Sequence, residues 1–308
     1  MIVTLTANPA LDYTAYVPQL ELGEVNRFRN PLLDPAGKGI NASRMIHRLG
    51  WPTIAFGFLA GDIGHIAMQA LDQEGVPHHF VPVPGQTRIN VTIVEDSKRS
   101  TSLYGPGPVV DSQHQEILEG MLDFWMQACR VLVLAGSLPT GMPKDSYASF
   151  IRRARSLDVC TILDADGEAL RLGVEAKPNL IKPNVEEAQR LLGRELPDQA
   201  AVLEGARELC RRGIEMVIIS MGAQGAVCVR GEQAWKALPP SVERRSTVGS
   251  GDSLVAGLAV AIARGQSFLE GLRLGTAAGA ATASTAGTSL GTGTDLARLM
   301  PRVPIEEL

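Results

Sequence analysis

Four consecutive residues near the C-terminal end of the chain, Gly249-Ser250-Gly251-Asp252, have the types and the order that suit phosphoryl transfer. The apolar segment Leu254–Ala263 predicts a helix directly after them, and Gly265 is a suitable residue for its C-terminal end. The N–H groups that open a helix bind anions together with the helix dipole, and glycines let the backbone approach a phosphoryl group closely. Asp252 would lie at or near the first turn, where its carboxylate could take a proton from an attacking hydroxyl. The alternative is that Asp252 only caps a buried helix.

A second group of polar residues, Lys182-Pro183-Asn184-Val185-Glu186-Glu187, follows the predicted strand Leu180–Lys182. Asn184 and Glu187 have the spacing of a capping box, which would give them a purely structural role. The functional alternative is that this amide and this carboxylate hold magnesium at the carboxyl edge of a sheet, directly or through water. The spacing alone leaves both open.

A third segment, Gly37-Lys38-Gly39-Ile40-Asn41, leads into the predicted helix Ile40–Leu49. It lacks the spacing of a P-loop, so it is not interpreted as one. It is either a plain turn into a helix or a cradle that holds sugar hydroxyls through backbone N–H groups, Lys38 and Asn41.

Polar and apolar residues alternate along Thr87–Val94, as in a strand with one wet face, and this alternation places Arg88, Asn90 and Thr92 on the same face. The planar guanidinium of Arg88 suits a phosphate, although a solvated arginine is the commoner case. The loop Ser220–Ala226 follows a predicted buried strand and carries Gly222 and Gly225. Such loops bind nucleotides in α/β sheets, but this one is a weak signal by itself.

The elements that must position these residues alternate between short apolar runs and helical patterns, which predicts a parallel sheet with helices on both sides. The predicted strands are Ile2–Thr6, Thr53–Gly57, Val131–Ala135, Cys160–Asp164, Leu180–Lys182 and Met216–Ser220, and the predicted helices include Ile40–Leu49, Ser146–Leu157 and Gln199–Arg212. Tyr13–Val17 and Asn26–Leu33 look extended. We therefore expect one domain over residues 1–308, with a β-rich lid formed by about residues 13–34 and 87–105.

Composition excludes several classes of function. Of the 308 residues, 45% are apolar and 20% are charged, and the formal net charge is −4, so no overall positive field exists to gather nucleic acid or anionic lipid. No two of the four cysteines form a C-x-x-C pair, and the histidines show no ligand spacing, which argues against zinc. Met1 leads straight into a strand-like run and no apolar stretch reaches the length of a membrane span, so we expect a cytoplasmic protein.

Seven motifs in order give the chain a resemblance to the ribokinase-like carbohydrate kinases, specifically the phosphofructokinase B branch. They are Thr6-Ala7-Asn8-Pro9-Ala10-Leu11-Asp12, Gly37-Lys38-Gly39-Ile40-Asn41, Thr87-Arg88-Ile89-Asn90, Gly136-Ser137-Leu138-Pro139, Lys182-Pro183-Asn184 with Glu187, Ser220-Met221-Gly222-Ala223-Gln224-Gly225, and Gly249-Ser250-Gly251-Asp252. The resemblance implies a ribokinase-like three-layer α/β/α fold with a mainly parallel sheet and a small β-sheet lid.

The resemblance also implies a reaction and its groups. Asp252 would deprotonate the acceptor hydroxyl, the N–H groups of Gly249-Ser250-Gly251 would stabilise the transferring γ-phosphoryl of ATP, and Asn184 and Glu187 would organise Mg²⁺. The nucleotide site would include Lys182, Asn184, Ser220, Gly222 and Gly225. The sugar would be held by Asp12, Gly37, Lys38 and Asn41, and its phosphate by Arg88 and Asn90, with Arg27 and Ser137 as weaker candidates.

Two positions depart from the pattern of the wider family. Ala36 stands where the glycine-rich motif usually has its first glycine, and Ser246 stands where ribokinase-type members often carry aspartate. The second departure is typical of the phosphofructokinase B branch.

The motifs around Lys38, Arg88 and Ser137 look most like those of bacterial 1-phosphofructokinases, which favours fructose 1-phosphate over fructose 6-phosphate and tagatose 6-phosphate as acceptor. The resemblance further suggests a homodimer through the lid and a K⁺ ion near the loop between Ser246 and Val248. The remaining alternative is a sugar-phosphate sensor without catalytic activity.

Overall fold

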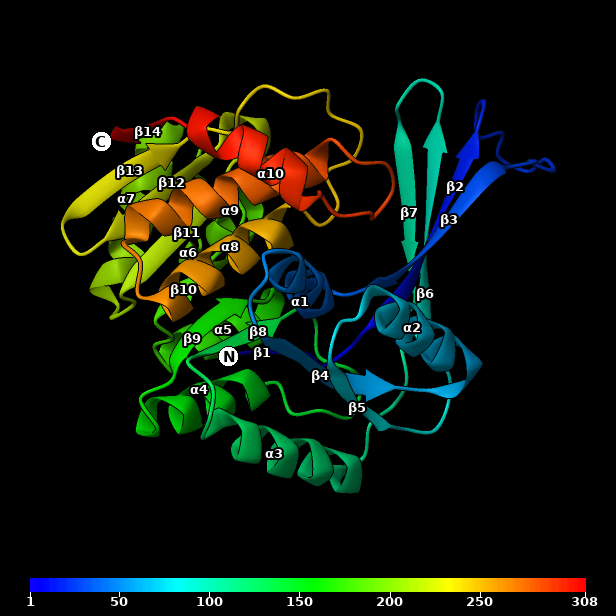
Figure 1. The fold of residues 1–308 in the computed structure, drawn as a ribbon, viewed down its shortest axis with the longest axis horizontal. Helices are drawn as coiled ribbons and strands as arrows, with labels where there is room; N and C mark the ends of the chain where they lie inside the picture. Colours follow the sequence, from blue (N-terminus) through cyan, green and yellow to red (C-terminus); the bar gives the residue numbers. More distant parts are fainter.

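Apolar strands form the centre of the protein, whose computed structural model describes residues 1–308 (Figure 1). Ten of them make one sheet in the order β14 (Ile305–Glu307), β13 (Gln233–Ala237), β12 (Ala226–Arg230), β11 (Met216–Ser220), β10 (Leu180–Ile181), β9 (Cys160–Asp164), β8 (Val131–Ala135), β1 (Ile2–Thr6), β4 (Thr53–Leu59) and β5 (His78–Pro82). The strands from β11 to β5 pair in parallel, and β12, β13 and β14 add an antiparallel edge. Each predicted strand is present, to within two residues at its end.

Helices cover both faces of this sheet, because its strands are apolar on both sides. One face packs against α3 (Ser112–Met126), α4 (Ser146–Ser156), α5 (Gly167–Glu175), α6 (Val185–Leu192) and α7 (Gln199–Arg211). The other packs against α1 (Lys38–Arg48), α8 (Ser250–Arg264), α9 (Phe268–Ala283) and α10 (Gly293–Leu299). Two short 3₁₀ turns, η1 (Gly222–Gln224) and η2 (Met300–Arg302), complete the helical elements. The predicted three-layer α/β/α arrangement is confirmed.

A second sheet of four strands stands beside the main body, in the order β3 (Arg29–Ala36), β2 (Ala10–Val17), β6 (Arg88–Glu95) and β7 (Ser100–Tyr104) (Figure 1). Strands β2 and β6 pair in parallel over their whole length, and the outer strands pair antiparallel to them. Helix α2 (Gly61–Glu74) contacts β2 and β3 at the base of this sheet. We call these four strands the small sheet.

The small sheet has one polar and one apolar face. Arg88 and Asn90 point toward the body, where they contact the β1–β2 connection and Asp12. Side chains of the opposite face remain open to solvent: Leu33 is 48%, Ile89 is 40% and Leu103 is 60% exposed. An apolar sheet face of this kind lacks a covering layer within one chain.

The prediction for Asn26–Leu33 is wrong at its start, because β3 begins only at Arg29 and continues to Ala36. Asn26 closes a turn instead: its side-chain amide donates to the carbonyls of Glu21 and Glu24 and accepts from the N–H of Glu21. Asparagine side chains commonly form such hydrogen bonds with nearby backbone groups, and these bonds stabilise a turn in place of a β-strand.

Helices α8 and α9 pack with their backbones in direct contact. A Cβ atom on Gly257 would overlap the backbone of Gly275, and one on Gly275 would overlap the carbonyl of Leu254. At Gly257 and Gly275, α8 therefore packs directly against the backbone of α9, with no side chain between the two helices.

None of the helices combines the length and the apolar composition that a membrane span requires.

Candidate active site

Asp252 is the third residue of α8 and is buried at the foot of that helix. Its Oδ2 atom accepts a hydrogen bond of 2.8 Å from Nδ2 of Asn41 in α1. Burial raises the pKa of the Asp252 carboxyl to about 6, and the nearby charge of Asp164 acts in the same direction. A carboxylate with a pKa close to neutral is suited to accept a proton.

The start of α8 has the geometry of an anion site. Gly249 precedes the helix in a left-handed conformation with φ of 77°, which favours glycine, and no side chain caps the helix. The first N–H groups of a helix lack partners within it, so those at Ser250 and Gly251 are available to a ligand. The Oγ atom of Ser250 is also buried without a hydrogen-bond partner. Asp252 and this hole lie within one helical turn, as the sequence predicts.

Two lysines and two carboxylates form a buried charged group below the hole. Lys38 Nζ lies 2.9 Å from Oδ1 of Asp164 and 3.5 Å from Oε1 of Glu187, and Lys182 Nζ lies 3.1 Å from Oδ2 of Asp164. Burial by itself raises the pKa of Asp164, but the two ammonium groups outweigh it and hold that pKa below its usual value. Lys182 also faces the hole, since a Cβ atom on Gly251 would lie 3.1 Å from its Nζ atom.

The capping box predicted for Asn184 and Glu187 is present: Asn184 Oδ1 accepts from the N–H of Glu187, and Glu187 Oε2 accepts from the N–H of Asn184. The structural role therefore exists, and it leaves Oε1 of Glu187 directed at Lys38 and open to a further partner.

The donor set fits magnesium in the way that kinases use it. No three His, Cys, Asp or Glu side chains gather into a group that could enclose a metal. Mg²⁺ is commonly bound by one or two carboxylates together with waters and the phosphates of the substrate, and Oε1 of Glu187, which the capping box does not use, would supply such an oxygen. When bound there, Mg²⁺ would neutralise charge on the β- and γ-phosphates.

Polar groups of the small sheet converge on Asp12 and the connection between β1 and β2. Asn90 Nδ2 donates a 2.9 Å hydrogen bond to Oδ1 of Asp12. Burial raises the pKa of Asp12 to about 6, and the hydrogen bond from Asn90 partly offsets this effect. The guanidinium of Arg88 donates to the carbonyls of Asn8, at 2.8 Å, and Pro9, at 3.3 Å. Hydroxyls of a sugar could replace or extend this network.

The remaining residues predicted for the sugar and its phosphate divide into two groups. Gly37 directly precedes α1 with a φ of 126°, which favours glycine, and Lys38 and Asn41 on the first turns reach Asp164 and Asp252. Ser137 lies within 3.4 Å of the Asn8 amide and lines a small cavity of about 180 Å³. Arg27 is not brought to the site: it is exposed on the turn between β2 and β3.

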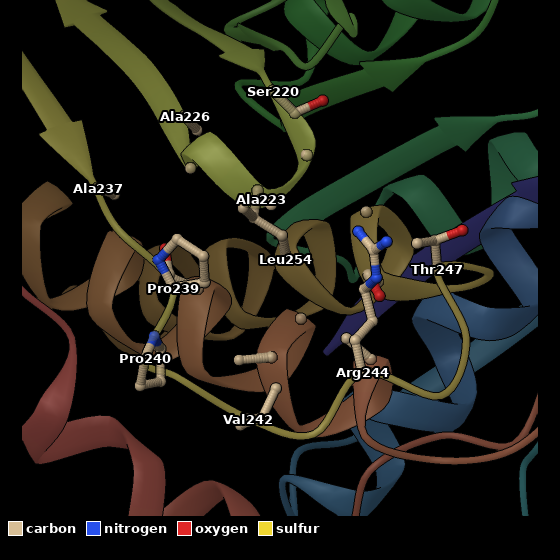
Figure 2. Close-up of a pocket in the computed structure, with 18 of the residues that line it drawn as sticks. Ser220, Ala223, Ala226, Ala237, Pro239, Pro240, Val242, Arg244, Thr247 and Leu254 are labelled. Atoms are coloured by element: carbon tan, nitrogen blue, oxygen red, sulfur yellow. The ribbon is translucent and has the colours of Figure 1, made fainter. Parts of the chain in front are cut away.

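A larger cavity of about 810 Å³ borders the hole (Figure 2). Four of the five residues predicted for the nucleotide line it, namely Asn184, Ser220, Gly222 and Gly225, together with Ser250 and Gly251. Lys182 does not line it and lies beneath, paired with Asp164. Pro239, Val242 and Leu254 give its other walls an apolar character, which suits a flat base.

Buried polar atoms without partners mark the same region. Seven side-chain atoms are buried without a hydrogen bond, and all but Nε1 of Trp51 belong to residues of the large cavity or of the polar networks described above: Ser250 Oγ and Thr276 Oγ1 in the cavity, and Asn8 Oδ1, Asn41 Oδ1, Asn90 Oδ1 and Asp164 Oδ2 in the networks. Of these, Asp164 Oδ2 still has Lys182 at 3.1 Å. Buried polar groups are rarely left unpaired, so this concentration indicates a ligand.

Two functional features escaped the sequence interpretation. Asp164 was assigned only to the end of a strand, although a carboxylate at the carboxyl end of a parallel strand is itself a signal for a site. The wall of the large cavity formed by residues 239–247 carries no motif that could have identified it.

A large cavity, a helix N-terminus and a buried carboxylate beside one another are the arrangement of a phosphotransferase of the α/β class. The family model of the pfkB family carbohydrate kinases matches residues 5–294. The chain is 36% identical to a 1-phosphofructokinase of Escherichia coli K12, covering 99% of this chain and 98% of that protein, and 34% identical to one of Bacillus subtilis, covering the whole of both. The chain therefore belongs to the pfkB family of carbohydrate kinases.

Solved structures agree with this assignment. The phosphofructokinase-2 of Escherichia coli in complex with substrates and products is similar over 98% of each chain, with a TM-score of 0.93 and 31% identity. A structure of that enzyme in complex with potassium has a TM-score of 0.91 over 98% of each chain, with 31% identity.

Proposed function

We propose that this protein uses ATP and Mg²⁺ to phosphorylate fructose 1-phosphate, giving fructose 1,6-bisphosphate and ADP. The observation that carries the proposal is the position of Asp252, which directly follows Ser250 and Gly251, two residues that line the large cavity, and whose carboxylate accepts a hydrogen bond from Asn41 in the segment predicted to hold the sugar. The relatives of the whole chain that are named 1-phosphofructokinases support this acceptor.

The proposed reaction is an in-line transfer. A hydroxyl oxygen of the acceptor forms a bond to the γ-phosphorus as the bond between that phosphorus and the bridging oxygen of ATP breaks, and Asp252 takes the hydroxyl proton. The N–H groups at Ser250 and Gly251 stabilise the charge on the transferring group. Lys38 and Lys182 hold Asp164 in place beneath it.

A second candidate acceptor is fructose 6-phosphate, favoured by the similarity to phosphofructokinase-2, with tagatose 6-phosphate as a third. A coupled assay of ADP release with Mg-ATP tests all of them, in parallel with unphosphorylated fructose. We expect kcat/KM for fructose 1-phosphate to exceed the others by at least about tenfold, or about 1.4 kcal/mol. A higher kcat/KM for one of the 6-phosphates would make that sugar phosphate the acceptor. Activity on none of the sugars would favour a sugar-phosphate sensor without catalytic activity.

Arg88 is the proposed clamp for the phosphate that the acceptor already carries. Arg88→Ala should raise KM for the sugar phosphate by roughly tenfold to a hundredfold, because a charge-assisted hydrogen bond is lost. Unphosphorylated fructose separates this role from the support that Arg88 gives to the carbonyls of Asn8 and Pro9. A loss of equal size for both sugars would assign Arg88 to structure instead.

The small sheet is proposed to act as a lid and to dimerise through its apolar face. The exposed side chains of Leu33, Ile89 and Leu103 support this. Arg27, on the turn between β2 and β3, would then be placed to reach the phosphate site of a second copy.

Leu103→Glu should convert the dimer into a monomer, because a charge would be buried at the contact. Sedimentation velocity measures the change, and Leu157→Glu is the matched control, since Leu157 is 46% exposed on the main body. Leu103→Glu remaining dimeric would exclude this interface.

The proposal also includes a K⁺ ion near the loop between Ser246 and Val248. It further includes a cytoplasmic location for the protein. The solved relative in complex with potassium supports the ion. A kinase rate that is independent of the monovalent cation present would remove it from the proposal.

A further inference from the structure

Arg244 is the only charged residue among the 20 that line the large cavity. It lies on the segment that connects β13 to α8, and this segment forms one wall of the cavity with Pro239, Pro240 and Val242. Figure 2 shows its side chain rising from this segment toward Thr247, with the guanidinium beside that threonine.

No carboxylate neutralises Arg244. It takes part in none of the ion pairs or side-chain hydrogen bonds of the structure, whereas Lys38 and Lys182 are both engaged by Asp164. The next residue, Arg245, differs: its Nη2 atom lies 3.8 Å from Oε2 of Glu243. An unpaired guanidinium facing a cavity keeps its full capacity to donate to an anion.

The backbone beside Arg244 is fixed although its side chain is free. The N–H groups of Arg245 and Ser246 donate to the carbonyl of Ala283 at 2.8 and 3.2 Å, at the C-terminal end of α9. Ala283 also lines the cavity. The backbone that carries Arg244 is thus held against the cavity, and Figure 2 shows the guanidinium on the side of Thr247, away from the walls at Ala226 and Ala237.

A nucleotide with several phosphates carries more negative charge than the N-terminus of α8 can offset, because a helix end supplies about half an elementary charge. The apolar walls suit the base, and the phosphates must point to the hole. Mg²⁺ and Lys182, which faces the hole, would offset part of this charge, and Arg244 is the only cationic side chain that lines the cavity itself.

We propose that Arg244 binds the phosphate chain of the nucleotide, so that the chain is held between this guanidinium and the N-terminus of α8. This inference rests on the proposed function and deepens it, since it assigns a phosphate-binding side chain to a segment outside the family motifs. Arg244 is specific for the charged part of the nucleotide and leaves the base to the apolar walls.

Calorimetric titration of the whole protein with ADP and with adenosine tests the proposal without any sugar. Arg244→Ala should raise Kd for ADP by roughly tenfold or more, as expected for one lost charge-assisted interaction, and change Kd for adenosine by less than about twofold. Arg245→Ala is the matched control and should leave both within about twofold. In kinetics, Arg244→Ala should raise KM for ATP and leave KM for the sugar phosphate unchanged.

Equal losses for ADP and adenosine, or equal losses in the two arginine variants, would overturn the assignment. If the wild-type protein binds no ADP, the proposed kinase function is wrong. If the wild-type protein and Arg244→Ala bind ADP with the same Kd, only the proposed role of Arg244 is wrong. Thermal unfolding without ligand shows that both variants fold, and their midpoints should match that of the wild type because Arg244 has no partner to lose.

Discussion

Asp252→Asn should lower kcat on the order of 10³-fold while changing Kd for ADP by less than about threefold, because general-base catalysis contributes about 10² to 10⁴. The amide has nearly the same shape, and its oxygen can still accept the hydrogen bond from Asn41. Only the capacity to take a proton is removed. Steady-state kinetics and calorimetry with ADP measure the two quantities.

The dependence of this effect on pH follows from the raised pKa of Asp252, which is about 6. The wild-type rate should fall as the pH decreases below about 6, since the base is then protonated. The folded state favours the protonated acid relative to the unfolded chain, whose value is 3.8, so ionisation costs stability as the pH rises from about 4 to about 6. Asp252→Asn escapes this cost and should be the more stable protein above pH 6.

Asp62→Asn is a matched control, because Asp62 is an exposed aspartate in the first turn of another helix, α2. It should leave kcat, Kd for ADP and the pH profile unchanged. A loss of less than about tenfold in Asp252→Asn would show that another group is the base.

Asp164→Asn should lower the free energy of unfolding by about 3 kcal/mol and abolish most of the activity. The substitution leaves Lys38 and Lys182 near each other without their shared carboxylate, and an uncompensated buried charge is strongly destabilising. The estimate is at the lower end of the usual range because the Lys38 side chain is 34% exposed. Urea unfolding, followed by fluorescence, measures the change.

Two further variants serve as controls for the unfolding measurement. Asp166→Asn, two residues along the chain and exposed, should change stability by less than about 0.5 kcal/mol. Adding Lys182→Met to Asp164→Asn should recover much of the lost stability, because the buried ammonium is removed as well. The pKa of Asp164 is held below its ordinary value of 3.8, so the ionised carboxylate stabilises the folded protein. The difference in the free energy of unfolding between the wild type and Asp164→Asn should therefore disappear as the pH falls below 3.8 and Asp164 becomes protonated. A double variant as unstable as Asp164→Asn would contradict this account.

The layers of the fold could be predicted from the sequence because each depends on local pattern. Continuous apolar runs such as Ile2–Thr6 predict buried parallel strands, and the alternation in Thr87–Val94 predicts a strand with one wet face. The start of α8 was predictable for the same reason, since Gly249 and Asp252 lie within one turn. The capping box at Asn184 was equally local, and the structure contains it in full.

Other features depend on contacts between residues far apart in the chain. Asp164 gains its importance from Lys38, which is 126 positions away, and only the fold makes them neighbours. The network of Asn90 and Asp12 joins two parallel strands, β2 and β6, that the sequence does not pair in advance. Arg244 carried no signal, because two adjacent arginines in a loop do not show which of them faces a cavity.

The contact between Gly257 and Gly275 has a consequence for natural variation in this protein. Most cores absorb a small change in volume by shifting side chains, but here two backbones touch and no such adjustment is available. Any larger residue at either position would displace α8, and with it the anion hole at the N-terminal end of the same helix. Substitutions in this contact would therefore appear first as losses of catalysis, although neither glycine lines a cavity.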